Sequence, residues 1–176
     1  MSHSNDELIA IKKWYRYNSF VRKKYIAAIE KLSPEEINRD RGASYPSLLD
    51  ILTHTVGAYC YWFFTNYGLK SPISPEEEIN SIKDLKDAEG KVDSVVLGFV
   101  EGLKSEDLQN TFERSDRTNR WRLTLEQMLW HLVEEELQHR GELNALFWQM
   151  DKDPPVTSWT DWKIELGELK PIGKVS

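Results

Sequence analysis

The chain has 176 residues, 40% of them hydrophobic, and a length that predicts one domain over residues 1–176. Its 23 Lys and Arg against 29 Asp and Glu give a net charge of −6, which disfavours binding to nucleic acid or to an anionic membrane surface. The single cysteine, Cys60, cannot form an internal disulfide, and no run of about 18 apolar residues indicates a membrane span. Because the charged N-terminus lacks the apolar run of a signal peptide, we expect a cytoplasmic protein.

The first two expected helices cover about residues 6–32 and 45–67. In both segments apolar residues recur every three or four positions, as in an amphipathic helix. Ser33 and Pro34 end the first helix, and Pro46 suits the first turn of the second. The later half of the second helix is apolar on nearly every side, so we expect it to be buried against more than one neighbour.

The third and fourth expected helices cover about residues 76–103 and 124–150. Glutamates at 76–78 suit the N-terminus of the third helix, and Thr124 with Gln127 has the spacing of a capping box. The connection between them allows a small two-stranded β excursion. Four helices of this length with short or moderate links predict an all-α four-helix bundle, followed by an irregular tail over 151–176.

The fourth helix places a histidine and a carboxylate toward the core. On a helical wheel, His139 lies in the middle of the apolar stripe and Glu135 lies about 40° from it. An unpaired buried carboxylate is strongly disfavoured, so Glu135 needs a cationic partner or a proton. A divalent metal would meet this need, because residues one helical turn apart can ligate a single ion.

The third ligand must come from another helix, and the chain has only four histidines. His54 shares a mostly apolar face of the second helix and is the candidate. His131 lies about 12 Å from His139 along the fourth helix, so these two cannot bind one ion. His131 could pair with Glu135 instead and is the reserve candidate, whereas His3 is expected in the N-terminal tail.

These side chains also allow a purely structural interpretation. His54 alone is more typical of a hydrogen-bonded core residue, and Glu135 with His139 can form a buried hydrogen-bonded pair. Glu136 and Glu142 would then belong to a solvated edge. His131, Glu136 and Glu142 are each plausible general bases, and spacing singles out none of them, so no catalytic residue is assigned.

Other conspicuous residues favour structural roles. Cys60 is expected to be an inert core residue. The helical tryptophans, expected to pack in the core, are Trp14, Trp62, Trp130 and Trp148. A basic loop, which is either solvated or an anion-binding rim over the mouth of the bundle, contains Arg114, Arg117, Arg120 and Arg122.

Over most of its length the chain resembles the DinB/YfiT-like family of metal-dependent four-helix bundles found in bacteria, and three stretches carry the resemblance. They are LLDILTHTVGAYCYW at 48–62, LWHLVEEELQHRGEL at 129–143 and the exit at Pro154-Pro155, with His139-Arg140-Gly141 the most distinctive element. The resemblance implies a metal held by one histidine on the second helix and two histidines one turn apart on the fourth. His54 and His139 match two of these positions, and Glu135 stands where the family usually has the third histidine.

The resemblance also implies a chemistry. Two histidines and one carboxylate suit zinc or nickel, and also iron or manganese. Relatives transfer or rearrange groups with low-molecular-weight thiols, which implies a metal-dependent thiol S-transferase or hydrolase acting on a small molecule. The family name refers to DNA-damage-inducible expression, a stress response, and implies no contact with DNA.

A second hypothesis is a non-catalytic helical bundle. In that case Glu135 and His139 form a structural pair, and exposed aromatic residues of the second helix and the tail, including Trp159 and Trp162, contact a protein partner. Under either hypothesis we expect a homodimer that binds neither nucleic acid nor membrane.

Overall fold

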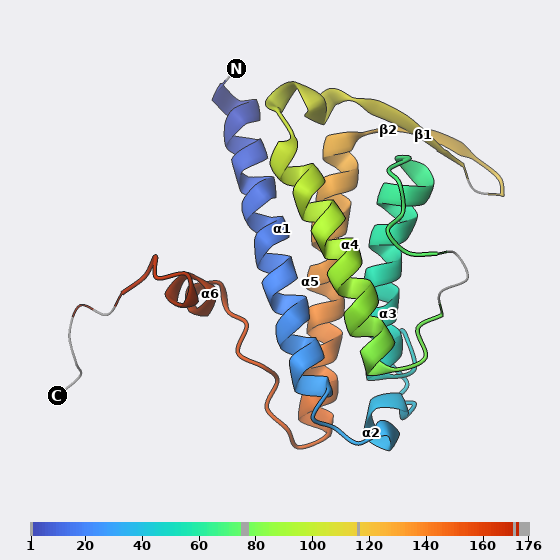
Figure 1. Ribbon diagram of the computed structural model, residues 1–176, viewed down its shortest axis with the longest axis vertical. Coiled ribbons are helices and arrows are strands. Elements are labelled where there is room, and N and C mark those ends of the chain that lie inside the picture. Colours follow the sequence, from blue (N-terminus) through green and yellow to red (C-terminus); the bar gives the residue numbers. More distant parts are fainter. Residues whose placement is uncertain (1, 75–77, 116, 171, 173–176) are drawn as a thin grey trace.

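The computed structural model describes residues 2–74, 78–115, 117–170 and 172. Four long helices run side by side, and a β-hairpin lies across one end of the bundle (Figure 1). A short helix, α6 (Trp159–Glu165), lies beside the bundle. Helices α1 (Ser2–Ile29) and α3 (Leu48–Tyr59) each contact both α4 (Ile82–Gly102) and α5 (Leu125–Gln149), so the four enclose a common core. The predicted all-α four-helix bundle with a small β excursion is confirmed.

Helix α1 covers Ser2–Ile29, so it begins before the predicted residue 6 and takes in the expected N-terminal tail. Its fully buried residues include Ile11, Tyr15 and Ile29. The short helix α2 follows over Pro34–Asn38. Ser33 caps α2, because its side chain accepts a hydrogen bond from the backbone N–H of Glu36, so the chain turns there as predicted.

Helix α3 covers Leu48–Tyr59 and continues as a π-helix, η1, over Cys60–Asn66. Its N-cap is Ser47, whose side chain accepts from the backbone of Asp50, so Pro46 precedes the helix and the prediction of Pro46 in the first turn was wrong. The wide π-turn changes the phase of the side chains. Trp62 and Phe63 are buried as expected, but Tyr61 is turned outward.

Helix α4 covers Ile82–Gly102, and a 3-10 turn, η2, covers Ser105–Gln109. The prediction that α4 begins at residue 76 was wrong. Ser81 is the N-cap and accepts from the backbone N–H of Asp84, while Glu78 lies outside the helix. Residues 76 and 77 lie outside the described residues. The capping side chain, and not the run of negative charge, sets the start of this helix.

Strands β1, Thr111–Ser115, and β2, Arg120–Thr124, form an antiparallel hairpin in which Arg114 is opposite Trp121. Helix α5 then covers Leu125–Gln149, with the capping box of Thr124 and Gln127 formed as predicted. None of the helices in the described part of the chain combines the length and apolar character that a bilayer span requires.

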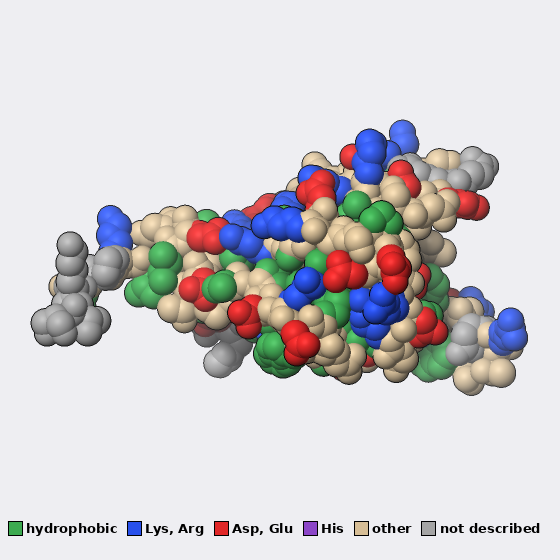
Figure 2. Space-filling model, turned by 90° about the horizontal axis from the view of Figure 1, so that it is seen from below, with side chains coloured by type: hydrophobic (Ala, Val, Ile, Leu, Met, Phe, Trp, Pro, Cys, Tyr) green, Lys and Arg blue, Asp and Glu red, His purple; other side chains and the backbone are tan. Residues whose placement is uncertain are grey.

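The prediction that the tail over 151–176 is irregular was wrong in part. The tail contains helix α6, Trp159–Glu165. Ser158 caps α6 by accepting from the backbone N–H of Asp161. Trp162 is buried, and its ring lies 5.5 Å from that of Tyr17 on α1. Seen from below, the end of the bundle carries acidic and basic side chains interspersed with hydrophobic ones (Figure 2).

Candidate metal centre

The structure brings His54 on α3 together with Glu135 and His139 on α5. Glu135 Oε2 lies 3.4 Å from His54 Nε2 and 3.3 Å from His139 Nε2. One ligand atom from each residue lies within 4.8 Å of the other two, an arrangement that could hold a metal ion. Helical phase indicated Glu135 and His139, and the small number of histidines left His54 as the third candidate. The packing of α3 on α5 brings the three side chains together.

The cluster lies in the wall of the bundle and not at its sealed centre. The His139 side chain is only 5% exposed, whereas those of His54 and Glu135 are 30% and 25% exposed. A cavity of about 210 Å³ opens beside them and is also lined by Tyr61 and Trp62 of the π-helix. A small molecule could therefore reach His54 and Glu135 from solvent, while His139 anchors the cluster from inside.

Glu142 lies within hydrogen-bond distance of the His139 ring. Its Oε2 lies 2.8 Å from His139 Nδ1. Burial alone would raise the pKa of Glu142, but hydrogen bonds with Ser44 and His139 lower it below the ordinary value. When His139 binds a metal through Nε2, this ionised carboxylate is placed to accept a hydrogen bond from its Nδ1–H. Glu142 thus supports the site, contrary to the solvated-edge interpretation.

Aromatic and imidazole rings hold the remaining side chains in place. Tyr45 is stacked on His54, with ring centroids 4.0 Å apart. His131 Nε2 lies 3.7 Å from Glu135 Oε1, the carboxylate oxygen that does not face the other two histidines, and the His131 ring packs edge-on against Trp62. As predicted for the reserve candidate, His131 is placed to pair with Glu135 and is not one of the three converging residues.

Glu136, the neighbour of Glu135, points to a different part of the bundle. It is buried and forms a salt bridge with Arg22 of α1. Two carboxylates of α4 share the same guanidinium, Asp93 at 2.7 Å from Nη2 and Glu89 at 3.4 Å from Nε. Glu136 is therefore not on a solvated edge, and it is not free to act as a general base at the cluster of His54, Glu135 and His139.

Arg22 and the three carboxylates around it, Glu89, Asp93 and Glu136, form what we call the Arg22 cluster. Burial disfavours the charged forms of Arg22, Glu89 and Glu136. Burial raises the pKa of Glu136 and of Glu89, although Arg22 counteracts the effect. Burial would lower the pKa of Arg22, but the surrounding carboxylates raise it well above the ordinary value, so the guanidinium stays charged. Sequence reasoning missed the cluster, although Arg22 stands between the core residues Val21 and Tyr25 of α1.

The basic loop is the β-hairpin, and its arginines have different surroundings. Arg120 and Arg122 pair with Glu113 at 2.7 and 3.1 Å. Arg114 donates from Nε to the Tyr61 hydroxyl at 3.1 Å, and its guanidinium carbon lies 5.1 Å from the centre of the Trp62 ring. Because Tyr61 and Trp62 line the cavity beside His54 and Glu135, Arg114 lies at the margin of that cavity. Arg120 and Arg122 are instead paired with a carboxylate.

Cys60 agrees with its predicted role, and Trp148 does not. Burial raises the pKa of Cys60 to about 11, so its thiol stays protonated at neutral pH, as expected of an inert residue. The prediction that the helical tryptophans pack in the core was wrong for Trp148, which is 61% exposed near the end of α5.

Fold and site together define a four-helix bundle with a His-Glu-His cluster that could hold a metal ion. The DinB family model matches residues 1–166, and the chain belongs to this family. A DinB-like protein from Bacillus cereus ATCC 10987 has a similar crystal structure, with a TM-score of 0.64 and 16% sequence identity over 84% of this chain and 95% of that chain. At this identity the likeness shows the fold alone. Among curated proteins, none matches the chain.

Proposed function

We propose that this DinB-family protein binds one divalent metal ion through His54, Glu135 and His139 and is a metal-dependent enzyme that acts on a small molecule. Transfer of a low-molecular-weight thiol is the preferred reaction, and hydrolysis is the alternative. Zinc and nickel are the preferred metals. The cytoplasmic location and the homodimeric state stay predictions.

The distances between the ligand atoms carry this proposal. Zinc bonded to nitrogen and oxygen at about 2.0–2.1 Å in a tetrahedron separates neighbouring ligand atoms by about 3.3 Å. Glu135 Oε2 lies 3.3 and 3.4 Å from the two Nε2 atoms, which matches two edges of such a tetrahedron. Direct N–H to O hydrogen bonds centre near 2.9 Å, so a purely structural cluster accounts less well for these separations.

The donor set fits a metal that activates a bound ligand. Two neutral imidazoles and one carboxylate leave a divalent ion with one net positive charge and a free position for a thiolate or a water-derived hydroxide. When bound, the metal would lower the pKa of a coordinated thiol or water. The thiol must come from outside, because Cys60 stays protonated and is not among the residues of the cavity beside His54 and Glu135.

The residues of this chain would orient that reaction. Glu142 would accept a hydrogen bond from Nδ1–H of His139, and Tyr45 stacks on the ring of His54. The cavity gives access to the side of the cluster formed by His54 and Glu135, and Arg114 at its margin provides a positive charge for an anionic substrate or thiol.

Metal analysis of protein purified without a tag or chelator tests the proposal. We expect about one metal ion per chain in the wild type and a loss of most of it in His139→Ala. Gln138→Ala is the matched control, because it changes the exposed neighbour of His139 on the same helix, and it should keep the metal. Sub-stoichiometric metal that His139→Ala leaves unchanged would contradict the proposal and favour the structural cluster.

The reaction requires a second experiment on the metal-loaded protein. Thiols are offered with electrophilic substrates, and hydrolysable esters and amides are offered without thiol. Consumption of thiol that depends on His54 supports transfer, and ester or amide cleavage that depends on His54 supports hydrolysis. A loaded protein that turns over neither class favours the non-catalytic bundle.

A further inference from the structure

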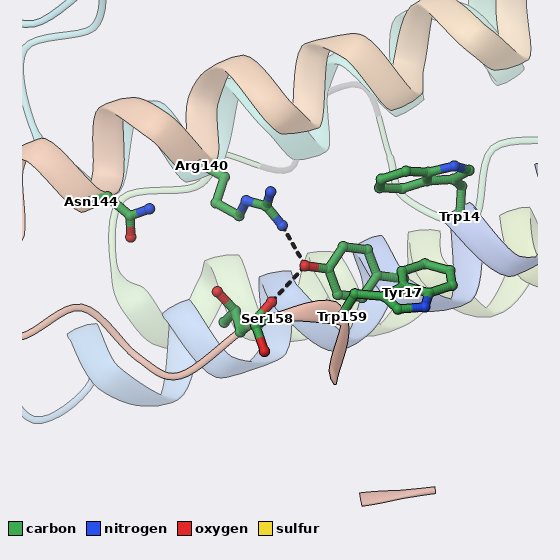
Figure 3. Close-up of a pocket in the computed structure, with 7 residues that line it drawn as sticks. Trp14, Tyr17, Arg140, Asn144, Ser158 and Trp159 are labelled. Atoms are coloured by element: carbon green, nitrogen blue, oxygen red, sulfur yellow. Dashed lines mark hydrogen bonds between the residues drawn. The ribbon is translucent and has the colours of Figure 1, made fainter. Parts of the chain in front are cut away.

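A second and larger cavity lies on the α1 side of α5. Its volume is about 650 Å³, within the range of small-molecule sites, and it lies between α1, α5 and residues 157–159, which lead into α6 (Figure 3). Arg140 contributes to this cavity, whereas His139 belongs to the metal centre. Successive helical residues diverge by about 100°, so the two sites use different faces of α5.

Arg140 presents unused hydrogen-bond donors to the cavity. Its Nη1 donates to the Tyr17 hydroxyl at 2.6 Å, and that hydroxyl donates to the carbonyl oxygen of Thr157 at 2.5 Å, as Figure 3 shows. This chain of bonds joins α5, α1 and the segment before α6. The other N–H groups of the guanidinium have no partner among the described residues, although the side chain is half-buried.

Asn144 adds a second donor one turn further along α5. The Tyr25 hydroxyl donates to its Oδ1, and burial raises the pKa of Tyr25 to about 12, so this donor stays protonated. The amide nitrogen is left without a partner in the part of the chain that the structure describes. The described residues that line the cavity include no Asp or Glu, so its charged lining group is the cation of Arg140.

Indole rings form the apolar part of the cavity. The rings of Trp14 and Trp159 lie 5.4 Å apart and tilted to each other, and Tyr17 lies 5.0 Å from Trp159. Trp159 remains 37% exposed, so part of its surface is available to a ligand. A flat apolar body can lie against these rings.

We propose that this cavity binds a small organic anion with an aromatic or apolar body. Arg140 and Asn144 hold its carboxylate by charge-assisted hydrogen bonds, and Trp14 and Trp159 contact the rest of the molecule. The proposal does not depend on metal binding, because the cavity shares no residue with the His54, Glu135 and His139 cluster.

Calorimetric titration with 2-naphthoate tests this site, with the neutral 2-naphthamide as the matched probe. We expect one naphthoate per chain and at least about tenfold weaker binding of the amide, because the amide cannot pair with the guanidinium. Arg140→Gln should weaken naphthoate binding at least tenfold, and Arg39→Gln, an exposed arginine paired with Glu35, should not change it. Equal binding of the two probes, or no binding of either, overturns the proposal.

Two more variants keep the test independent of folding and of the metal centre. Asn144→Asp retains an oxygen acceptor for Tyr25 but places a negative charge in the cavity, so naphthoate binding should fall at least tenfold in a protein that stays folded. His54→Ala should leave naphthoate binding unchanged. Naphthoate binding that survives Asn144→Asp but is lost in His54→Ala would place the anion at the metal centre and contradict the second site.

Discussion

Two consecutive glutamates of α5 have opposite surroundings. Glu136 meets the guanidinium of Arg22, so its negative charge is balanced by a cation that the chain itself provides. Glu135 lies between His54 and His139, whose imidazoles are neutral when they act as metal ligands. A buried carboxylate matched by an internal cation becomes costly only when that cation is removed. A partly exposed carboxylate that converges with two imidazole nitrogens leaves a position that an external cation can fill.

This difference predicts that substitutions in the two clusters change different properties of the protein. Removing a charge from the Arg22 cluster should lower the free energy of unfolding. Removing a ligand from the metal centre should mainly lower metal affinity, because that cluster is partly open to solvent. The following changes test the comparison in order of decreasing expected effect.

Arg22→Met should have the largest effect. It leaves the buried carboxylates of Glu89, Asp93 and Glu136 without their shared guanidinium, and breaking a buried charge pair in this way costs about 3–5 kcal/mol. Urea unfolding measures this loss. The control is Arg16→Met, which removes an exposed pair with Glu101 and should cost less than about 1 kcal/mol. Equal losses in the two variants would contradict the structural role of the Arg22 cluster.

Glu135→Gln should abolish most metal binding with little effect on folding. Loss of a ligand that touches the metal should weaken zinc binding by more than about 100-fold, the upper end of the range for outer hydrogen-bond partners. Zinc titration by calorimetry gives the affinity, and urea unfolding of the metal-free protein gives the stability. Glu136→Gln is the neighbouring control and should show the reverse pattern. If the zinc affinity of Glu135→Gln equals that of the wild type, Glu135 is not a ligand.

Glu142→Gln should have an intermediate effect on metal affinity. The ionised Glu142 accepts the Nδ1 proton of His139, and the neutral amide is a weaker acceptor that also allows the other tautomer. Outer partners of metal-bound histidines are typically worth about 10-fold to 100-fold in affinity, and we expect a loss in this range. The same zinc titration measures it, and an unchanged affinity would show that Glu142 does not orient His139.

Glu89→Gln should have the smallest effect on stability, and the size of that effect should depend on pH. Because burial raises the pKa of Glu89, the folded wild type binds more protons than the unfolded chain between the ordinary value of 4.5 and the raised one. Stability that depends on this proton is present at low pH and is lost as pH rises through that window. The stability of the variant relative to the wild type should therefore increase from pH 4 to pH 7. A relative stability that falls over this interval would contradict the sign.

Helical periodicity predicted which side chains converge better than it predicted the boundaries of the helices. Glu135 and His139 share a defined phase on one helix, and His54 was the histidine left to meet them from another helix. The start of α4 was missed because it depends on a single capping side chain, Ser81. The prediction relied on the glutamates at 76–78, but Glu78 lies outside the helix.

The surroundings of the site could be predicted only in part. Phase places Glu136 near the edge of the apolar stripe of α5, but it cannot show that Arg22 of α1 reaches that edge. The partner lies on another helix, and its contact depends on how the helices are rotated against each other. The orientation of Arg114 likewise depends on the register that places it opposite Trp121. Glu142, by contrast, lies one turn after His139, a spacing that the sequence does contain.

X-ray absorption spectroscopy of the zinc-loaded protein tests the central claim most directly. The account predicts two imidazole nitrogens and one carboxylate oxygen at about 2.0–2.1 Å from zinc, with a further light atom completing the coordination. His54→Ala should reduce the imidazole signal to one ring. A spectrum without imidazole ligands, or one that His54→Ala leaves unchanged, would show that zinc does not bind at His54, Glu135 and His139.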